Sequence, residues 1–279
     1  MNENVSYAGD PSGSAPSNHH PTEKEPMQPP KAEQQAPTSS DVPSSWIGTA
    51  ESGRGDYFGP LVIAGVLVTM ETQKELSALG IGNADTLLHK SIYWLAGQIR
   101  QLCPHSIAVI DPPHYNALHD RMRSIFRILG SGHARVIEVI LSNHSCEHAV
   151  VSNFGAAKHL RSALMDKGKR INILQPTHAK DDLAVAAASI LARVAYLNSL
   201  RSLSSTYRFP LPKGAGRPAI EAGRRFVSQV GKANLKYVAK LHFSTSGYVL
   251  NPDSQFPPSP VPDTNIDEVL ASLQEDESD

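Results

Sequence analysis

Apolar and polar positions in the middle of the chain first predict a pair of strands. Residues 46–50 (WIGTA) and 61–69 (LVIAGVLVT) are rich in β-branched side chains, and a glycine-rich turn separates them. This pattern is typical of a β-hairpin. Next come apolar side chains at helical spacing over residues 87–102 and a short apolar run at 106–111. These predict a helix and then a buried strand.

The following hundred residues predict an alternation of helices and strands. Residues 116–141 have a helical pattern, with an expected interruption at 130–132 (GSG), and the stretch 149–154 (AVVSNF) predicts a strand. A helix over 156–167, a strand over 170–175 and a long Ala-rich helix after Asp182 follow. An aspartate is favourable at that helix start because the N-terminal end of a helix is positively polarised. The order predicts an α/β domain with a mixed sheet flanked by helices.

Charge divides the chain into three parts. Residues 1–45 contain six acidic side chains, two lysines and eight prolines, and residues 251–279 contain eight carboxylates with no Lys or Arg. Both compositions predict disordered ends, a Pro/Ser-rich arm and an acidic tail. The remaining domain, 46–250, carries 24 Lys and Arg against 13 Asp and Glu, a net charge of +11. Such a surplus favours a polyanionic partner.

Several classes of protein are disfavoured by the composition. The chain has two cysteines, which argues against a disulfide scaffold and suits a reducing compartment. The longest unbroken apolar run, 61–68, is too short to span a bilayer, and residues 1–10 lack the pattern of a signal peptide. We therefore expect a cytoplasmic protein with no membrane role, and a monomer.

Several motifs in order resemble one enzyme family. The segment IGTAESGRGDYFGPLVIAGVLV (47–68) resembles the first strand and turn of type 2 ribonucleases H, and its DYFGPL portion is most similar to the ribonuclease HIII branch. Further similar stretches are PPHYNALHD (112–120) with GHARVIEVI (132–140), AVAAASILARVAYL (184–197), and LPKGAG (211–216) with GKANLKYVAKLHF (231–243). Together they cover essentially all of 46–250.

The resemblance implies a ribonuclease H-like fold, in which a mixed β-sheet is flanked by helices. It also implies an endonuclease that cleaves the RNA strand of RNA–DNA hybrids and leaves 5′-phosphates. It also implies four carboxylates and two Mg²⁺ or Mn²⁺ ions. Two divalent cations can activate the attacking water and stabilise the departing oxygen of a phosphodiester. Such hard cations prefer oxygen ligands, which explains a cluster of Asp and Glu.

This chain departs from the family pattern at the carboxylates. The Asp–Glu pair that ends the first strand is Ala50–Glu51 here, and Ser152 stands where a second aspartate is usual. The family's Ala-Glu or Ala-Asp dipeptide before the long helix is Ala179–Lys180, and its Asp-Ser-Lys motif is replaced by ADT at 84–86. By resemblance, Glu51 and Asp182 remain as catalytic and metal-binding residues.

Loss of two anionic ligands predicts weakened or lost metal binding and impaired hydrolysis. A methyl or hydroxyl group does not replace an anionic oxygen, and each 1.4 kcal/mol of lost transition-state stabilisation costs about tenfold in rate. Asp56, Asp111 or Asp181 could substitute, or the Lys180 ammonium could supply positive charge beside Glu51. Three hypotheses stay open: an active ribonuclease, a catalytically dead hybrid-binding pseudoenzyme, and a degenerate paralogue with neither property.

Substrate-binding residues are also implied by the resemblance. Gly53, Arg54 and Gly55 match the family's glycine-flanked turn, which contacts ribose 2′-hydroxyls of the hybrid; such contacts distinguish RNA from DNA. Lys213, Lys240 and His242 lie in the last third of the domain, where basic side chains could bind phosphates. An ordinary tight turn and a solvated basic surface are the alternative interpretations.

Overall fold

A computed structural model describes residues 44–82, 92–155, 157–251 and 253–254. Almost all of the arm (1–45) and the tail (251–279) lies outside the described residues, so their predicted disorder stays a prediction. The ADT stretch at 84–86 and the first part of the helix expected over 87–102 lie outside them as well.

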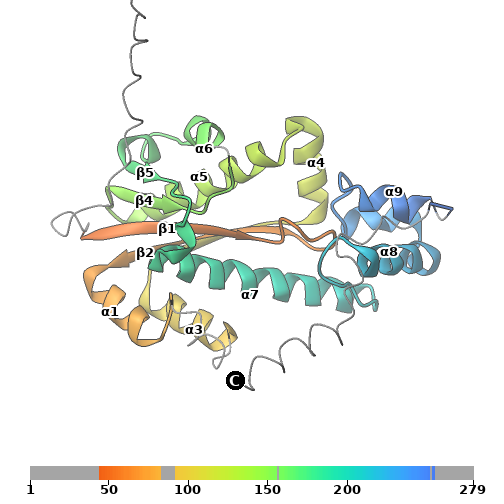
Figure 1. The fold of residues 1–279 in the computed structure, drawn as a ribbon, viewed down its shortest axis with the longest axis horizontal. Helices are drawn as coiled ribbons and strands as arrows, with labels where there is room; N and C mark the ends of the chain where they lie inside the picture. Colours follow the sequence, from red (N-terminus) through yellow and green to blue (C-terminus); the bar gives the residue numbers. More distant parts are fainter. Residues whose placement is uncertain (1–43, 83–91, 156, 252, 255–279) are drawn as a thin grey trace, which may run out of the picture. The chain divides into compact units, whose positions relative to one another are not determined.

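A five-stranded mixed sheet forms the centre of the domain, in the order β3-β2-β1-β4-β5 (Figure 1). β1 and β2 pair as the predicted antiparallel hairpin, β3 adds antiparallel to β2, and β4 and β5 run parallel to β1. The mixed α/β architecture is thereby confirmed. The strands are β1 (Ser45–Ser52), β2 (Leu61–Thr69), β3 (His105–Ile110), β4 (His148–Val151) and β5 (Asn172–Leu174).

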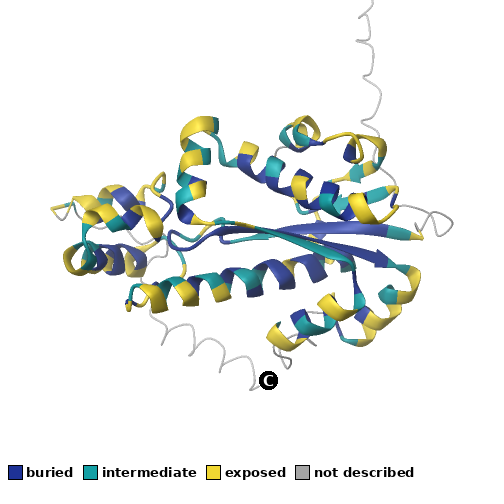
Figure 2. Cartoon of the chain, turned by 180° about the vertical axis from the view of Figure 1, so that it is seen from behind, coloured by how far each residue is buried: buried dark blue, intermediate teal, exposed yellow. Residues whose placement is uncertain are grey.

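Helices cover both faces of this sheet and bury its central strands (Figure 2). One face carries α1 (Met70–Ala78), α3 (Ile92–Leu102) and α7 (Leu183–Thr206), and the other carries α4 (Pro112–Met122), α5 (Ile125–Asn143) and α6 (Ala157–Ala163). Alternate residues of β1 face opposite layers. Gly48 faces α7 so closely that a Cβ atom would lie 2.1 Å from the carbonyl carbon of Ala184.

The long Ala-rich helix α7 is the central helix of its layer. Within the described part of the chain, it alone is long and apolar enough to cross a membrane by length and composition. Its buried side chains pack against β1, β2 and α3 in the core. Small alanines let the helix approach the sheet closely, so core packing accounts for its apolar character.

The helical stretch expected over 116–141 is interrupted, but the predicted place of the interruption, 130–132, is wrong. The chain breaks at Arg123, which has a left-handed backbone (φ 52°) as the C-cap of α4, and α5 then runs unbroken through Gly130 and Gly132. These glycines serve packing instead. A Cβ at Gly130 would lie 2.7 Å from the backbone of His159 in α6, and one at Gly132 would lie 2.6 Å from the side chain of Ile63.

Residues 214–251 lie beyond the C-terminal end of β1 (Figure 1). The backbone N–H of Tyr57, in the turn between β1 and β2, donates to Gly214, and Phe58 forms an isolated bridge with Ala239. This part contains α8 (Arg217–Val230) and α9 (Thr245–Leu250). The described residues also form short 3₁₀ segments: η1 (Gly168–Arg170), η2 (Ala179–Asp181) and η3 (Lys232–Tyr237).

Candidate functional site

Glu51, near the C-terminal end of β1, is surrounded by groups that can stabilise its negative charge. The hydroxyl of Ser152, just after β4, donates a short hydrogen bond to Oε2. The Nε2 atom of His133 lies 3.4 Å from the same oxygen, Oε2. A guanidinium nitrogen of Arg54 lies 3.7 Å from the other carboxylate oxygen, Oε1. Parallel pairing of β4 with β1 brings Ser152 here, because its backbone N–H donates to Thr49.

His133 is a site residue that the sequence analysis did not single out. It lies on α5 and is completely buried, with Nδ1 2.8 Å from the hydroxyl of Thr49 and its ring stacked on Phe154 at 5.0 Å. Its Nε2 atom makes no hydrogen bond to any described residue, since the contact with Glu51 is close but lies outside hydrogen-bond geometry. A histidine inside an apolar helical pattern gave no signal, because its neighbour Glu51 is far away in sequence.

These neighbours determine the charge state of Glu51. Burial by itself raises the pKa of this carboxyl. The contacts with His133, Ser152 and Arg54 outweigh that effect and lower the pKa to about 2. Glu51 is therefore an ionised carboxylate whose charge is balanced within the protein.

The two positions that lack the family's aspartates have different surroundings. Ala50 is 4% exposed, pairs with Ala64 of β2 and belongs to the core on the α7 side. Ser152 uses its hydroxyl to bond Glu51. Neither side chain offers an anionic oxygen, so a single carboxylate remains where the resemblance implies several.

Asp182 is engaged elsewhere. Its carboxylate caps α7 by accepting from the backbone N–H of Val185 at 2.9 Å, and it accepts from the indole N–H of Trp46 at 3.0 Å. Burial raises the pKa of Asp182 despite these bonds. Trp46 lies near the start of β1, five residues or roughly 16 Å along the strand from Glu51. The structure therefore assigns Asp182 to a helix cap and does not join it to Glu51.

The possible substitutes for the missing carboxylates also lie in other places. Asp56 accepts from the backbone N–H of Gly214 at 2.6 Å, and Asp111 caps α4. Asp181 and Lys180 are exposed on η2, and Lys180 is not among the ion-pair partners found for Glu51 in the described residues. In that part of the chain, no three His, Cys, Asp or Glu side chains are grouped so that they could hold a metal ion.

The predicted substrate turn is built as its glycines require. Gly53 has φ +83°, and a Cβ there would lie 2.3 Å from the carbonyl oxygen of Pro60, whereas Gly55 is exposed with open space around it. Between them, the half-buried guanidinium of Arg54 lies 5.6 Å from the ring centre of the exposed Phe126. The turn thus presents a cation, an aromatic ring and an open backbone beside Glu51.

His242 lies beside Tyr115. The Tyr115 hydroxyl is 3.4 Å from Nε2 of His242, and the rings of His242 and His119 stack at 4.1 Å. Burial raises the pKa of Tyr115, and the charge of Arg54 opposes this shift. Partial burial of its ring, together with the charges of His119 and Lys240, lowers the pKa of His242 to about 4. Tyr115 therefore lies beside His242 and within the electrostatic influence of Arg54.

The two predicted lysines differ. Lys240 has no exposed surface, and its ammonium donates to the carbonyl of Gly59 at 2.7 Å, so its predicted role as a surface phosphate contact is wrong. Desolvation lowers its pKa to about 7, although Asp56 opposes the shift. The sequence KLHF gave no sign that the lysine points inward. Lys213 is exposed, and its role in binding phosphate stays a prediction.

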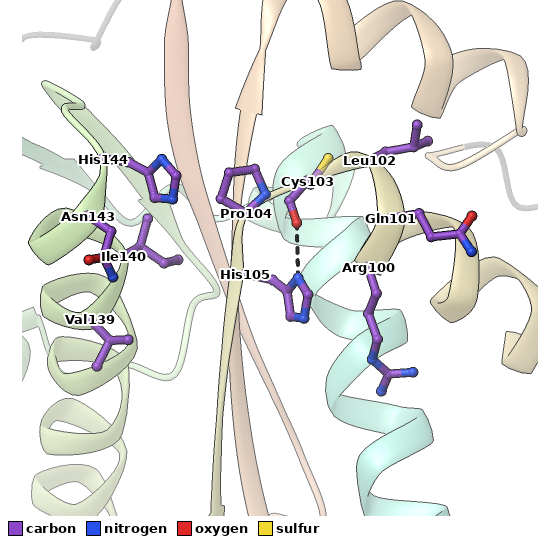
Figure 3. A pocket seen from close by; sticks show the side chains of 10 residues that line it. All are labelled: Arg100, Gln101, Leu102, Cys103, Pro104, His105, Val139, Ile140, Asn143 and His144. Carbon is purple, nitrogen blue, oxygen red and sulfur yellow. Dashed lines mark hydrogen bonds between the residues drawn. The ribbon is translucent and has the colours of Figure 1, made fainter.

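A separate hollow of about 440 Å³ lies between α3, the start of β3 and the end of α5 (Figure 3). It is lined by His105, His144 and Arg100 among others, and Nδ1 of His105 lies 2.9 Å from the carbonyl oxygen of Cys103. His105 pairs with Val66 of β2, three residues along that strand from Ile63, the partner of Glu51. The hollow contains none of the predicted site residues.

Comparison with known proteins supports the geometry of the fold. The model of the Ribonuclease HII family matches residues 47–246, which is most of the domain. The chain belongs to the ribonuclease HII family. Among its members, "Ribonuclease HIII" of Protochlamydia amoebophila is 39% identical over 214 residues, covering 77% of this chain and 71% of the relative. "Ribonuclease HIII" of Chlamydia pneumoniae is 37% identical over 202 residues, covering 71% and 68%.

A solved structure of the ribonuclease HII family agrees with this result. The crystal structure of Bst-RNase HIII in complex with Mn²⁺ superposes with a TM-score of 0.67 at 29% identity, covering 76% of this chain and 71% of that one. A point mutant of the same protein gives a TM-score of 0.68. The predicted resemblance to ribonuclease HIII is confirmed, and so is the fold.

Proposed function

We propose that this ribonuclease HIII homologue binds RNA–DNA hybrids but has lost most of the metal-dependent hydrolysis of its family. The observation that supports the loss is the surroundings of Glu51. Where the family pattern has clustered carboxylates, Glu51 meets the guanidinium of Arg54, the imidazole of His133 and the hydroxyl of Ser152.

The residues present do not fit a pair of divalent ions. Mg²⁺ and Mn²⁺ require several oxygen ligands, and two such ions held together require anionic ones to offset their mutual repulsion. Glu51 supplies the one carboxylate of this cluster, Ala50 supplies none, and Arg54 lies where it would repel a cation. A relative has been crystallised with Mn²⁺, so the departure concerns this chain's substitutions. We therefore derive no catalytic step through metal.

Binding is supported by features that the substitutions leave intact. The turn at 53–55 retains both glycines, the guanidinium of Arg54 lies over the ring of Phe126, and His242 is exposed beside Tyr115. Cations and aromatic rings bind nucleic acids through phosphate attraction and stacking. The +11 charge of residues 46–250 favours the same class of ligand. We include in the proposal a cytoplasmic location and a monomeric state.

Cleavage of a labelled RNA–DNA hybrid in Mg²⁺ and in Mn²⁺ tests the loss of hydrolysis. The unaltered chain should give little or no product, and the double variant Ala50→Asp/Ser152→Asp should give more. A matched control, Ala50→Asn/Ser152→Asn, has similar side-chain size without charge and should remain inactive. Efficient cleavage by the unaltered chain would contradict the proposal.

Gel-shift titrations at fixed salt test hybrid recognition. The chain should bind an RNA–DNA hybrid more tightly than a DNA duplex of the same sequence, and Arg54→Ala should reduce the difference. Equal affinity for both duplexes would refute hybrid recognition. The absence of binding to either would indicate a paralogue with neither property.

A further inference from the structure

The segment between β4 and β5 forms a second basic surface, separate from the turn at 53–55. Residues 158–170, from α6 to η1, hold one carboxylate, that of Asp166, and none of the segment's cationic side chains belongs to an ion pair found in the described residues. α6 and the turn after it are largely exposed (Figure 2). The five exposed cations are Lys158, Arg161, Lys167, Lys169 and Arg170.

A buried carboxylate holds this surface in a defined conformation. Glu138 of α5 is 8% exposed and accepts from the backbone N–H groups of Met165 at 2.7 Å and Gly168 at 2.9 Å. Gly168 fits closely, because a Cβ there would lie 2.8 Å from Oε1 of Glu138. The ammonium of Lys167 donates to the carbonyl of Leu141 at 3.1 Å. The turn is thus held by bonds to α5 while Lys158, Arg161, Lys169 and Arg170 remain exposed, so less conformational entropy is lost on binding.

Two of the cations share one hollow. Arg161, on α6, and Lys169, in η1, line a depression of about 290 Å³ together with Asn172 of the edge strand β5. An arginine and a lysine that face one hollow without a carboxylate partner provide donors and charge for a phosphate group. By contrast, two arginines of α8 already have protein partners: Arg217 pairs with Glu221, and Arg224 donates to backbone carbonyls.

We propose that residues 158–170 form a phosphate-binding surface for the backbone of a nucleic acid, outside the turn that recognises the hybrid. The surface has a net charge of +4 from its own side chains, and the charge of Glu138 beneath it leaves +3. α6 begins shortly after Ser152, whereas the hollow of Arg161 and Lys169 lies toward the other end of β4, where Asn172 pairs with His148. A duplex that reaches from Glu51 to this hollow would run along the β4–β5 edge of the sheet. The ligand class is that of the proposed function, but the residues are different.

The salt dependence of binding tests this surface. The variant Arg161→Ala/Lys169→Ala is compared with Lys74→Ala/Arg100→Ala, which removes the same charge from exposed positions on α1 and α3 across the sheet. Affinities for an RNA–DNA hybrid and for a DNA duplex are measured by fluorescence anisotropy at several salt concentrations. The slope of log K against log salt is negative, and each lost phosphate contact reduces its magnitude by about 0.9.

We expect the Arg161/Lys169 variant to lose roughly 1–2 units of slope and about tenfold in affinity at low salt, on both duplexes, while the control keeps the wild-type slope. An unchanged slope, or an equal change in the control, overturns the inference. If that happens while hybrid preference persists, the proposed function stands alone. A reduced slope without hybrid preference supports this surface and contradicts the proposed function, and no binding to either duplex contradicts both.

Discussion

The imidazole of His133 lies against the carboxylate of Glu51, with Nε2 3.4 Å from Oε2. His133 comes from helix α5, and Glu51 comes from strand β1 of the sheet that this helix covers. His133 is completely buried, whereas the side chain of Arg54, the other nitrogen-bearing neighbour of Glu51, is 39% exposed. An electrostatic contact is stronger in a buried environment than beside water, whether the partner of the carboxylate is a dipole or a charge. The buried contact should therefore contribute more to stability than the exposed one.

A pair of double-mutant cycles measures this difference. Glu51→Gln combined with His133→Asn should show a coupling energy of about 1–3 kcal/mol in urea unfolding. Glu51→Gln combined with Arg54→Ala should show less than about 1 kcal/mol, as is usual for exposed pairs. Equal coupling in the two cycles would mean that burial does not strengthen the His133 contact.

Restoring an aspartate at position 50 should make stability depend on metal. Ala50, which precedes Glu51 in the sequence, is buried. Ala50→Asp therefore places a carboxylate in the core and should cost about 2–4 kcal/mol of unfolding free energy. In Ala50→Asp/Ser152→Asp, a bound ion would offset part of this cost, by about 2.7 kcal/mol at a hundredfold excess over its Kd.

The measurement is a thermal melt with and without Mn²⁺. The double aspartate variant should melt at a higher temperature in Mn²⁺, whereas the unaltered chain and Ala50→Asn/Ser152→Asn should not respond. A rise of similar size in the unaltered chain would show that its present residues hold the ion, contrary to the misfit argued above.

Asp182 should behave as a helix cap. Removing the carboxylate in Asp182→Ala leaves the N–H of Val185 and the indole of Trp46 without their acceptor and should cost about 1–3 kcal/mol in urea unfolding. Asp182→Asn keeps a side-chain oxygen, and asparagine is a good N-cap, so most of the stability should remain. If Asn were as destabilising as Ala, the negative charge itself would be the important feature.

Much of the fold could be predicted from local sequence patterns, and the reason differs between elements. The β1–β2 hairpin and the start of α7 at Asp182 follow from signals within a few residues. The break at Arg123 was missed because its left-handed backbone has no glycine to mark it. The glycines at 130 and 132 suggested an interruption, but they relieve contacts with α6 and β2 that come from distant parts of the chain.

The candidate site shows the same limit. The order of the motifs placed Ala50 and Glu51 near the end of β1 and Ser152 just after β4, because the motifs mark these strands in the resembling family. Tertiary packing places His133 beside Glu51, and it also buries Lys240; neither position can be read from the local sequence. Residue type alone does not distinguish a lysine that points to solvent from one that donates to a buried carbonyl, because both occur in short polar segments.

Lys240 makes stability depend on alkaline pH. Its folded pKa is about 7 because burial disfavours the ammonium, and its ordinary value is 10.5. Between these values the unfolded chain holds a proton that the folded chain releases, so the free energy of unfolding rises with pH. From pH 7 to 9 the rise from this group is at most about 2–3 kcal/mol.

Urea unfolding at pH 7 and 9 tests this dependence. Lys240→Met should show a smaller increase than the unaltered chain, whereas Lys213→Met, at an exposed position, should follow the unaltered chain. An identical increase in the Lys240 and Lys213 variants would mean that Lys240 titrates alike in the folded and unfolded chain.

Two helical glycines should respond in opposite directions to the same substitution. Alanine is favoured over glycine in a helix by about 1 kcal/mol. At Gly97 of α3 nothing lies within 4 Å of an added Cβ, so Gly97→Ala should stabilise the protein by up to that amount. At Gly130 of α5 the added Cβ would meet the backbone of His159 and Leu160 at 2.7–2.9 Å, and Gly130→Ala should force α5 and α6 apart. Overpacking of this kind costs about 1–3 kcal/mol, which outweighs the gain in propensity. Urea unfolding of the two variants gives the sign directly; stabilisation by Gly130→Ala would show that helix propensity exceeds the packing constraint between α5 and α6.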